Sequence, residues 1–388
     1  MDTTESNDLI TETTEATLRF YSKQRKEYYV LTVEEMETWR FVFYCFVIPI
    51  TIVIGLVGNI SSFIVLNRKA LRSTQTLILL ALTFTDTVNL MSALWYCATF
   101  TAKYFYREEI ENLLNLSYPY FGSLLSVIWG RTSCLLVAVI SVERCIIVIA
   151  PLRAKIIWTR KVAMVSIAIS YVLPIIILIP NLLEYKSERI YEQNSTNYKI
   201  GLRLTELGED RDFYGIVYNV GVAVLRYVPT LVVMCTNIAI SIGLWYHTAQ
   251  RRKLTEDAVS KIASSDLQIT KTLLIISLVF FFTTTPGTLI LLIQNVDPEY
   301  NFPFFRNNAY IAAFIVSYWL DILNSSINFI IYIISNKRFR REYKELLLCC
   351  SQKMQRIKHA SKYSSKTTSS STLPTSENKS TSENLSLG

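Results

Sequence analysis

Seven long apolar segments dominate this chain of 388 residues. Each has about 20 residues or more, enough for a helix to cross the roughly 30 Å hydrocarbon core of a bilayer. A lone strand cannot satisfy its backbone hydrogen bonds in lipid, so all seven are predicted to be helices. They run over residues 41–66, 75–101, 113–148, 162–182, 214–246, 264–294 and 307–334. The predicted fold class is an all-α membrane protein, a bundle of seven transmembrane helices.

The charges outside these segments predict the orientation. Residues 1–40 and the loops that follow the second, fourth and sixth segments carry a net charge of −8, whereas the other loops and the C-terminal segment carry +16. Cytoplasmic loops are enriched in Lys and Arg. The sequence therefore predicts a multi-pass plasma-membrane protein with an extracellular N-terminus, whose first apolar segment is its signal-anchor. The net charge of +8 follows from this topology, so no nucleic-acid partner is expected.

Three regions are expected. Residues 1–40 form an extracellular tail, residues 41–350 form the membrane domain, and residues 351–388 form a disordered cytoplasmic tail rich in Ser and Thr. The membrane domain ends in a short amphipathic cytoplasmic helix whose basic face suits an anionic inner leaflet. Its apolar face carries Phe339, Tyr343, Leu346 and Leu347.

Several modification sites are predicted. Asn115 and Asn194 each begin a glycosylation sequon on the predicted outer side. Cys349 and Cys350 follow the amphipathic helix and are palmitoylation candidates, with two free thiols as the alternative reading. The Ser/Thr run over 364–376 is a candidate phosphorylation cluster.

Polar residues inside membrane helices are costly and usually functional, so the few that interrupt the apolar segments carry most information. In chain order the informative residues are Gly58, Asn59, Asp86, Glu143, Arg144, Cys145, Pro229, Phe280, Pro286, Asn324, Ser325, Ser326, Asn328 and Tyr332. Seven helices with these residues in this order resemble the rhodopsin-like (class A) G-protein-coupled receptors over about residues 41–350. The string from Asn324 to Tyr332, with Pro180 to Tyr185 closing the fourth segment, resembles invertebrate FMRFamide and myosuppressin-type neuropeptide receptors.

The resemblance implies a receptor that binds an extracellular neuropeptide, such as an amidated Arg-Phe peptide, and activates heterotrimeric G proteins. Arrestin is then expected on the phosphorylated tail. The resemblance also implies that Glu143, Arg144, Asp266 and Tyr332 form the G-protein switch, in which an Arg144–Asp266 pair holds the sixth helix closed. The alternative is an exposed interfacial pair of about 0–1 kcal/mol.

The chain departs from the family pattern at several positions. Cys145 replaces an aromatic residue, Phe329 replaces a proline, and Thr284 replaces a tryptophan. The family disulfide between the third helix and the second outer loop cannot form, because Pro119 occupies the helix position and residues 183–213 contain no Cys. Cys45 and Cys97 lie near outer helix ends, either as a substitute pair or as free thiols.

Asp86 is a lone carboxylate at mid-membrane depth. Ser133 is expected at the same depth, and Asn324 and Asn328 lie one turn apart on the seventh helix. These four residues match the sodium pocket of rhodopsin-like receptors, and oxygen ligands suit a hard cation. The alternative is a water-filled polar network without an ion. No other cofactor is expected.

The predicted ligand-binding residues are Ser126, Arg131, Glu184, Arg226, Gln294 and Asp321. Ser126 stands where amine receptors of this family carry an aspartate, and the seventh segment lacks the lysine that opsins need. Both ligand types are therefore disfavoured. The charged residues Arg131, Arg226 and Asp321 either form a buried cluster beneath the pocket or contact charged groups of a peptide.

Nothing in the sequence indicates catalysis, so an enzyme is not expected. Two other functions remain as alternatives. One is a chemosensory or odorant receptor for a small molecule on the same fold. The other is a seven-helix transporter, which would usually show internal hydropathy repeats, and the sequence has none.

Overall fold

The computed structural model describes residues 32–68, 73–103, 106–191, 198–251, 260–296 and 308–348. Within its helices, some side chains are outside this description, namely those of residues 33, 103, 107–109, 122–123, 211, 214, 247–251, 260–271, 294–296 and 308–310. The chain divides into two compact units, residues 1–337 and 338–388, and each is described by itself.

Seven helical spans in the described residues are long and apolar enough to cross a membrane, which confirms the predicted bundle. They cover Glu34–Leu66, Thr74–Ala102, Ile110–Ile149, Arg160–Leu182, Gly215–Tyr246, Thr272–Ile293 and Ile311–Ser335. Each overlaps one predicted segment. The first begins earlier than predicted because a capping box starts it: the Glu35 N–H donates to Thr32 Oγ1 at 3.2 Å, and the Thr32 N–H donates to Glu35 Oε2 at 2.8 Å.

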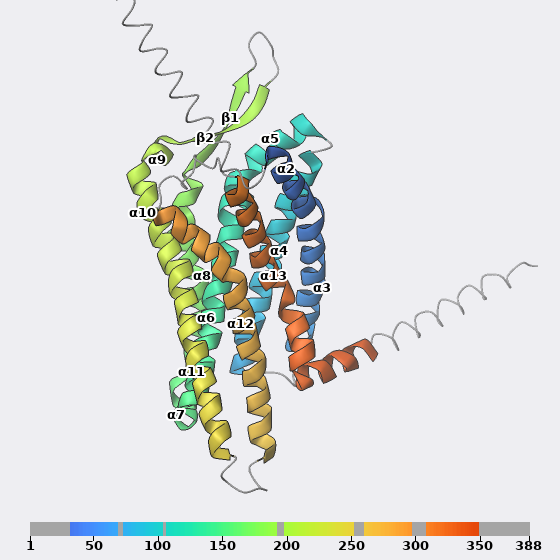
Figure 1. Cartoon of the computed structure of the whole chain (residues 1–388), viewed down its shortest axis with the longest axis vertical. Coiled ribbons are helices and arrows are strands. Elements are labelled where there is room, and N and C mark those ends of the chain that lie inside the picture. The colour runs from blue at the N-terminus through green and yellow to red at the C-terminus, as the bar shows by residue number, and fades with distance from the viewer. Residues whose placement is uncertain are drawn as a thin grey trace, which may run out of the picture. The chain divides into compact units, whose positions relative to one another are not determined.

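Figure 1 shows the elements of the first unit as a bundle of nearly parallel helices with a hairpin at one end. Its helices up to the hairpin are α2 (Val33–Val42), α3 (Ile48–Leu66), α4 (Thr74–Lys103), α5 (Arg107–Ser117), α6 (Ser126–Ile149), α7 (Pro151–Ile157) and α8 (Arg160–Leu178), then the 3₁₀ turn η4 (Ile179–Leu182). Those after it are α9 (Glu206–Glu209), α10 (Arg211–Val222), α11 (Val228–Arg251), α12 (Ser260–Val296) and α13 (Asn308–Ser335).

Three of the spans contain a π-helical turn next to a proline. These turns are η1 (Phe43–Val47), η3 (Tyr118–Leu125) and η5 (Ala223–Tyr227). Pro49 and Pro229 follow η1 and η5 by two residues, and Pro119 lies inside η3. A proline has no N–H for the helix ladder and crowds the turn before it, so the backbone there widens. Each wide turn changes the direction in which its side chains point.

A two-stranded antiparallel hairpin follows the fourth span and was missed by the sequence analysis. Strands β1 (Tyr185–Tyr191) and β2 (Tyr198–Leu204) pair in the register Tyr185 with Leu204 and Tyr191 with Tyr198. Six of the seven β1 side chains are exposed. The strand therefore lacks the alternation of apolar and polar residues by which a half-buried strand is recognised in a sequence. The short helix α9 follows, and its N-cap Thr205 also anchors the hairpin base, since the Thr205 N–H donates to the Glu184 carbonyl at 3.0 Å.

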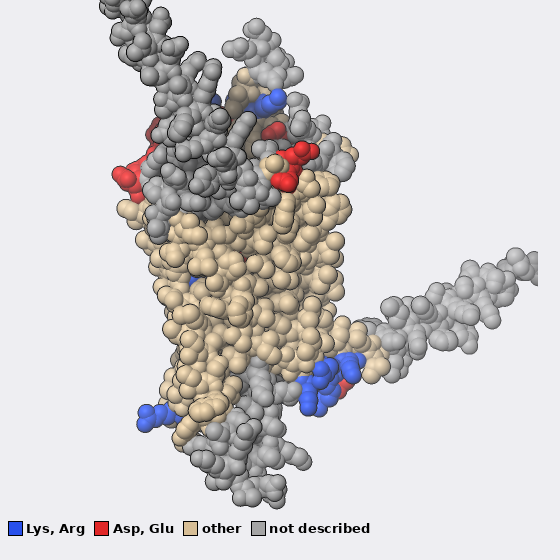
Figure 2. Space-filling view, in the orientation of Figure 1, with Lys and Arg blue, Asp and Glu red and all other residues tan. Residues whose placement is uncertain are grey.

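Helix α6 packs against α4, α8, α11 and α12, while α3 packs against α4 and α13. Large apolar side chains are exposed around the outside, among them Ile54, Val57, Ile176 and Ile242. Figure 2 shows that the middle of the bundle is almost entirely free of surface charge, with Lys and Arg side chains near α7 at the end opposite the hairpin. Such a belt is the surface expected of helices that face lipid.

The described part of the second unit is helical over residues 338–348, which confirms the predicted short helix after the seventh span. Cys349, Cys350 and the predicted phosphorylation cluster over 364–376 lie outside the described residues.

Candidate functional site

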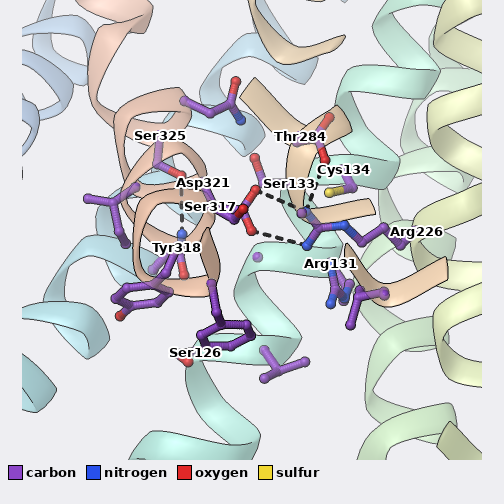
Figure 3. Close-up of a pocket in the computed structure, with 18 of the residues that line it drawn as sticks. Ser126, Arg131, Ser133, Cys134, Arg226, Thr284, Ser317, Tyr318, Asp321 and Ser325 are labelled. Atoms are coloured by element: carbon purple, nitrogen blue, oxygen red, sulfur yellow. Dashed lines mark hydrogen bonds and ion pairs between the residues drawn. The ribbon is translucent and has the colours of Figure 1, made fainter. Parts of the chain in front are cut away.

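A cavity of about 290 Å³ lies within the bundle between α4, α6, η5, α12 and α13. Figure 3 shows several of its polar side chains pointing into one space. Four of the predicted ligand residues, Ser126, Arg131, Arg226 and Asp321, line it together. Its other polar or thiol-bearing side chains come from Tyr44, Asn89, Tyr96, Tyr118, Ser133, Cys134, Thr284, Ser317, Tyr318, Asn324 and Ser325.

Arg226 forms the wall of the cavity on the α12 side. It lies in the wide turn η5, which directs its side chain toward α12 and α13. The guanidinium forms a forked pair with Asp321, with Nη1 to Oδ2 at 3.0 Å and Nη2 to Oδ1 at 3.3 Å. Its Nε donates to Thr288 Oγ1 at 3.0 Å, and Nη2 also donates to the Thr284 carbonyl at 3.1 Å. All three nitrogens therefore have partners, and Asp321 is neutralised within the protein.

Gly287 makes room for this pair. A Cβ atom at this position would collide with the Arg226 guanidinium, so only glycine lets the arginine approach α12 so closely. Thr284 also contributes its carbonyl, a backbone contact that its side-chain identity does not indicate. These contacts support the cluster reading for Arg226 and Asp321.

Arg131 lies beside this pair on α6 and has a different environment. The thiol of Cys134, one turn along the helix, accepts a hydrogen bond from it. Arg226 and Asp321 lie within electrostatic range, yet Arg131 forms no ion pair with any described carboxylate. In Figure 3 the Arg226 side chain reaches toward Asp321, while Arg131 lies to one side of the pair.

Asp86 anchors a second polar cluster next to the cavity, and it is fully buried. Ser133 donates to its Oδ1 at 2.8 Å, and Asn328 Nδ2 donates to its Oδ2 at 2.7 Å. Three of the four predicted sodium residues therefore converge. Asn324 lines the cavity, as Ser133 does, but among the described contacts it has no hydrogen bond to Asp86.

Ser325 connects this cluster and was not among the predicted site residues. It donates to Asp86, and its hydroxyl oxygen accepts from Asn89 Nδ2 at 3.1 Å. Its carbonyl accepts from Asn59 Nδ2 at 2.9 Å. The signal for Asn89 was present in the sequence, because it follows Asp86 by three residues on the same helix face.

Two asparagines of α5 hold the hairpin. The Ile200 N–H donates to Asn112 Oδ1 at 2.7 Å, and Asn115 Nδ2 donates to the Ile200 carbonyl at 2.7 Å. Ser187 Oγ donates to the Asn115 carbonyl at 2.9 Å. Cys45 and Cys97 are both free, so the described residues contain no substitute disulfide here. The hairpin is joined to the third span by hydrogen bonds where the family has a covalent bridge.

This contact bears on the predicted glycosylation sites. A glycan would be attached to Asn115 Nδ2, the same atom that donates to Ile200 in a half-buried position on a helix. The structure therefore argues against Asn115 as a glycosylation site. Asn194 lies outside the described residues.

A family model described as "7 transmembrane receptor (rhodopsin family)" matches residues 58–332. The chain belongs to this family. The match covers the Asp86 cluster, every residue that lines the cavity except Tyr44, all of the second to sixth apolar segments, and parts of the first and seventh. Members are signalling receptors and not enzymes, so the chain is a multi-pass membrane receptor, as the sequence motifs implied.

The receptor is similar to proteins with different ligands. It is 25% identical to the melatonin receptor type 1A of Mus musculus, covering 80% of this chain and 81% of the relative. It is 23% identical to the substance-P receptor of the same species, covering 81% and 72%. It is 22% identical to the FMRFamide receptor of Drosophila melanogaster, covering 74% and 51%.

The receptor's predicted switch residues lie on three helices. Arg144 and Glu143 on α6 form an ion pair at 3.2 Å, and both side chains are only 2% exposed. Tyr332 on α13 is also buried. Asp266 lies on α12, but its side chain is outside the description, so its pair with Arg144 stays a prediction. The burial of Arg144 does not fit an exposed surface pair.

One predicted ligand residue of the receptor, Glu184, is not among the residues that line the cavity. Glu184 is half-buried at the hairpin base, where burial raises the pKa of its carboxyl and a hydrogen bond with Tyr185 partly opposes this. Tyr185 in turn packs edge-to-face on Tyr118, whose side chain does line the cavity. The Gln294 side chain is outside the description.

Proposed function

We propose that this chain is a plasma-membrane receptor for an extracellular neuropeptide and activates heterotrimeric G proteins. The observation that carries this proposal is the charged cavity, which combines the Arg226–Asp321 pair with Arg131. Such a lining favours a ligand with ionic and hydrogen-bonding groups. Helix α13 has no lysine for a retinal Schiff base, and Ser126 offers no carboxylate to an amine.

Amidated Arg-Phe peptides are the first candidates. The acidic segments of the predicted outer side suit a cationic peptide, and the FMRFamide receptor is among the relatives. Substance-P and allatostatin-A receptors are further relatives named for peptides. The extracellular N-terminus, palmitoylation at Cys349 and Cys350, glycosylation at Asn194 and arrestin binding to a phosphorylated tail belong to this same proposal.

The test is G-protein dissociation in cells that express the receptor at a verified surface level. Amidated peptides and their free-acid counterparts are applied in parallel at equal concentrations. A saturable response to one peptide class, absent in cells without the receptor, is the expected result. A response to small odorants with none to any peptide would instead favour the chemosensory alternative.

The Asp266→Ala variant is expected to raise basal G-protein activation several-fold, because α12 loses the proposed latch to Arg144. The measurement is G-protein dissociation without agonist at matched surface expression. Asp257→Ala, a change of the same chemistry in the preceding segment, is the control and is expected to leave basal activity unchanged. Equal basal activity in both variants and the native receptor contradicts the latch.

The residues around Asp86 offer the oxygen ligands that a sodium ion prefers, since carboxylate, hydroxyl and amide oxygens are hard ligands. Asp86 and Ser133 would hold it, with Asn324 and Asn328 alongside. The purified receptor is expected to melt at a higher temperature in sodium chloride than in potassium chloride at equal ionic strength. Asp86→Asn is expected to remove this difference. A native receptor that melts identically in both salts rules out the sodium site and leaves a polar network.

A further inference from the structure

Two arginines line the cavity, and only one is neutralised. Arg226 has a forked ion pair and two further hydrogen bonds. Arg131 has the Cys134 thiol, which is a weak acceptor, and no described carboxylate forms an ion pair with it. The arrangement therefore provides one guanidinium that the protein has fixed in place and another whose charge is not balanced.

The cavity as a whole carries one excess positive charge. Arg131, Arg226 and Asp321 are the only charged residues in its described lining. An arginine side chain stays protonated in proteins, and burying its charge without a partner is costly. Exchanging partners does not help, because a single Asp321 carboxylate cannot neutralise both arginines. No other charged residue in the described lining supplies the missing negative charge.

We propose that Arg131 is the binding group for a carboxylate of the ligand, which deepens the proposed function and rests on it for the identity of the natural ligand. A carboxylate matches the planar fork of a guanidinium and accepts two hydrogen bonds from it. The Arg226–Asp321 pair lies beside this position, and its charges are already neutralised within the protein.

The size and lining of the cavity limit what enters. A volume of about 290 Å³ holds one side chain or one chain end and not a whole peptide. Apolar side chains complete the lining, from Val127, Ile290, Leu291, Phe314 and Ile322. The group that enters therefore combines a carboxylate with an apolar part. In an amidated peptide this group is an Asp or Glu side chain beside an apolar residue, whereas in a free-acid peptide it can also be the C-terminal residue.

The first experiment uses small probes and does not require the natural ligand. The purified full-length receptor is titrated with 3-phenylpropionate and with 3-phenylpropionamide, which has nearly the same shape without the charge. We expect the carboxylate to bind on the order of tenfold more tightly than the amide and to raise the melting temperature more. Equal binding of both probes, or no binding of either, overturns the proposal.

Three variants assign the effect to Arg131. Arg131→Gln is expected to lose the preference for the carboxylate, whereas Arg131→Lys keeps the charge and retains a weaker preference. Arg153→Gln removes an exposed arginine on α7 and is expected to retain the full preference. Without any probe, Arg131→Gln is expected to melt at or above the native temperature, because it removes an unbalanced charge. A lower melting temperature, or a retained preference, overturns the proposal.

Peptide arms then distinguish the two sources of the carboxylate. For each peptide that activates the receptor, the free acid is compared with the amide, and each Asp or Glu is replaced by Asn or Gln. The change that weakens activation identifies the source, and that change is expected to have no further effect in Arg131→Gln. An agonist that needs no carboxylate overturns the proposal. Probe binding at Arg131 without any peptide response contradicts the peptide function alone.

Discussion

Arg226→Gln is expected to lower the free energy of unfolding by about 2–3 kcal/mol, which makes it among the most damaging single changes in the cavity. The substitution leaves the Asp321 carboxylate without its forked partner and removes one of the two side-chain donors to the Thr284 carbonyl. Removing one member of a buried pair typically costs about 3–5 kcal/mol, and the 34% exposure of Asp321 reduces this. The measurement is the melting temperature of the purified receptor, together with its surface expression.

The double variant Arg226→Gln/Asp321→Asn separates the pair from the rest of the site. Because it removes both charges, it is expected to recover part of the loss, with a coupling of about 1.5 kcal/mol between the positions. Arg203→Gln is the matched control, since it breaks an exposed pair with Glu188 at 3.6 Å and should change stability little. If Arg226→Gln melts like Arg203→Gln, the pair does not stabilise the cavity.

The sequence predicted the spans and the Asp86 cluster because both depend on regular helix geometry. Hydropathy reveals a stretch of lipid-facing helix directly, and Ser133 and Asn328 meet Asp86 at the depth that helix periodicity assigns to them. Asn324 is the exception, because it forms no hydrogen bond to Asp86 among the described contacts. Ser325, one residue from the predicted Asn324, faces Asp86, since a rotation of about 100° per residue decides which neighbour points inward.

The sequence did not predict which of the two arginines forms an ion pair with Asp321. Arg131, Arg226 and Asp321 were recognised as a set, but their pairing depends on the wide turn η5 and on the space left by Gly287. A π turn adds a residue to the helix and shifts everything before it, and no periodicity in the sequence marks that shift. Only the structure therefore shows that Arg226 pairs with Asp321 and that Arg131 has no ion pair with a described carboxylate.

The hairpin and its attachment were also beyond the sequence analysis. The contacts of Asn112 and Asn115 join residues about 85 positions apart, and polar side chains on a loop-facing helix leave no apolar pattern. Ile200 pairs with Arg189 across the hairpin and turns its own N–H and carbonyl toward α5. The two asparagine amides supply one acceptor and one donor, as a neighbouring strand would. The hydrogen bonds of Asn112 and Asn115 attach the hairpin to α5 at the place where the family has a disulfide.

Replacing Asn112 and Asn115 together with Ala is therefore expected to release β2 from α5. The Ile200 N–H loses its acceptor and its carbonyl loses its donor, at about 1–2 kcal/mol each. Amide hydrogen exchange across Tyr198–Leu204 is expected to accelerate on the order of tenfold to a hundredfold, while exchange within α11 stays unchanged. The measurement is hydrogen–deuterium exchange of the purified receptor, read peptide by peptide.

Ser117→Ala is the matched control for this pair, because it destroys the sequon at Asn115 and leaves both asparagine amides in place. It is expected to keep the slow exchange of β2 and to leave the electrophoretic mobility of the receptor unchanged. Two results would contradict the clamp. Slow exchange in the double variant would mean that the hairpin is held by other contacts, and a mobility shift in Ser117→Ala would mean that Asn115 carries a glycan and cannot make this bond. Fast exchange in the double variant alone would establish that two side-chain amides substitute for a covalent bridge, at a few kcal/mol that local opening can overcome.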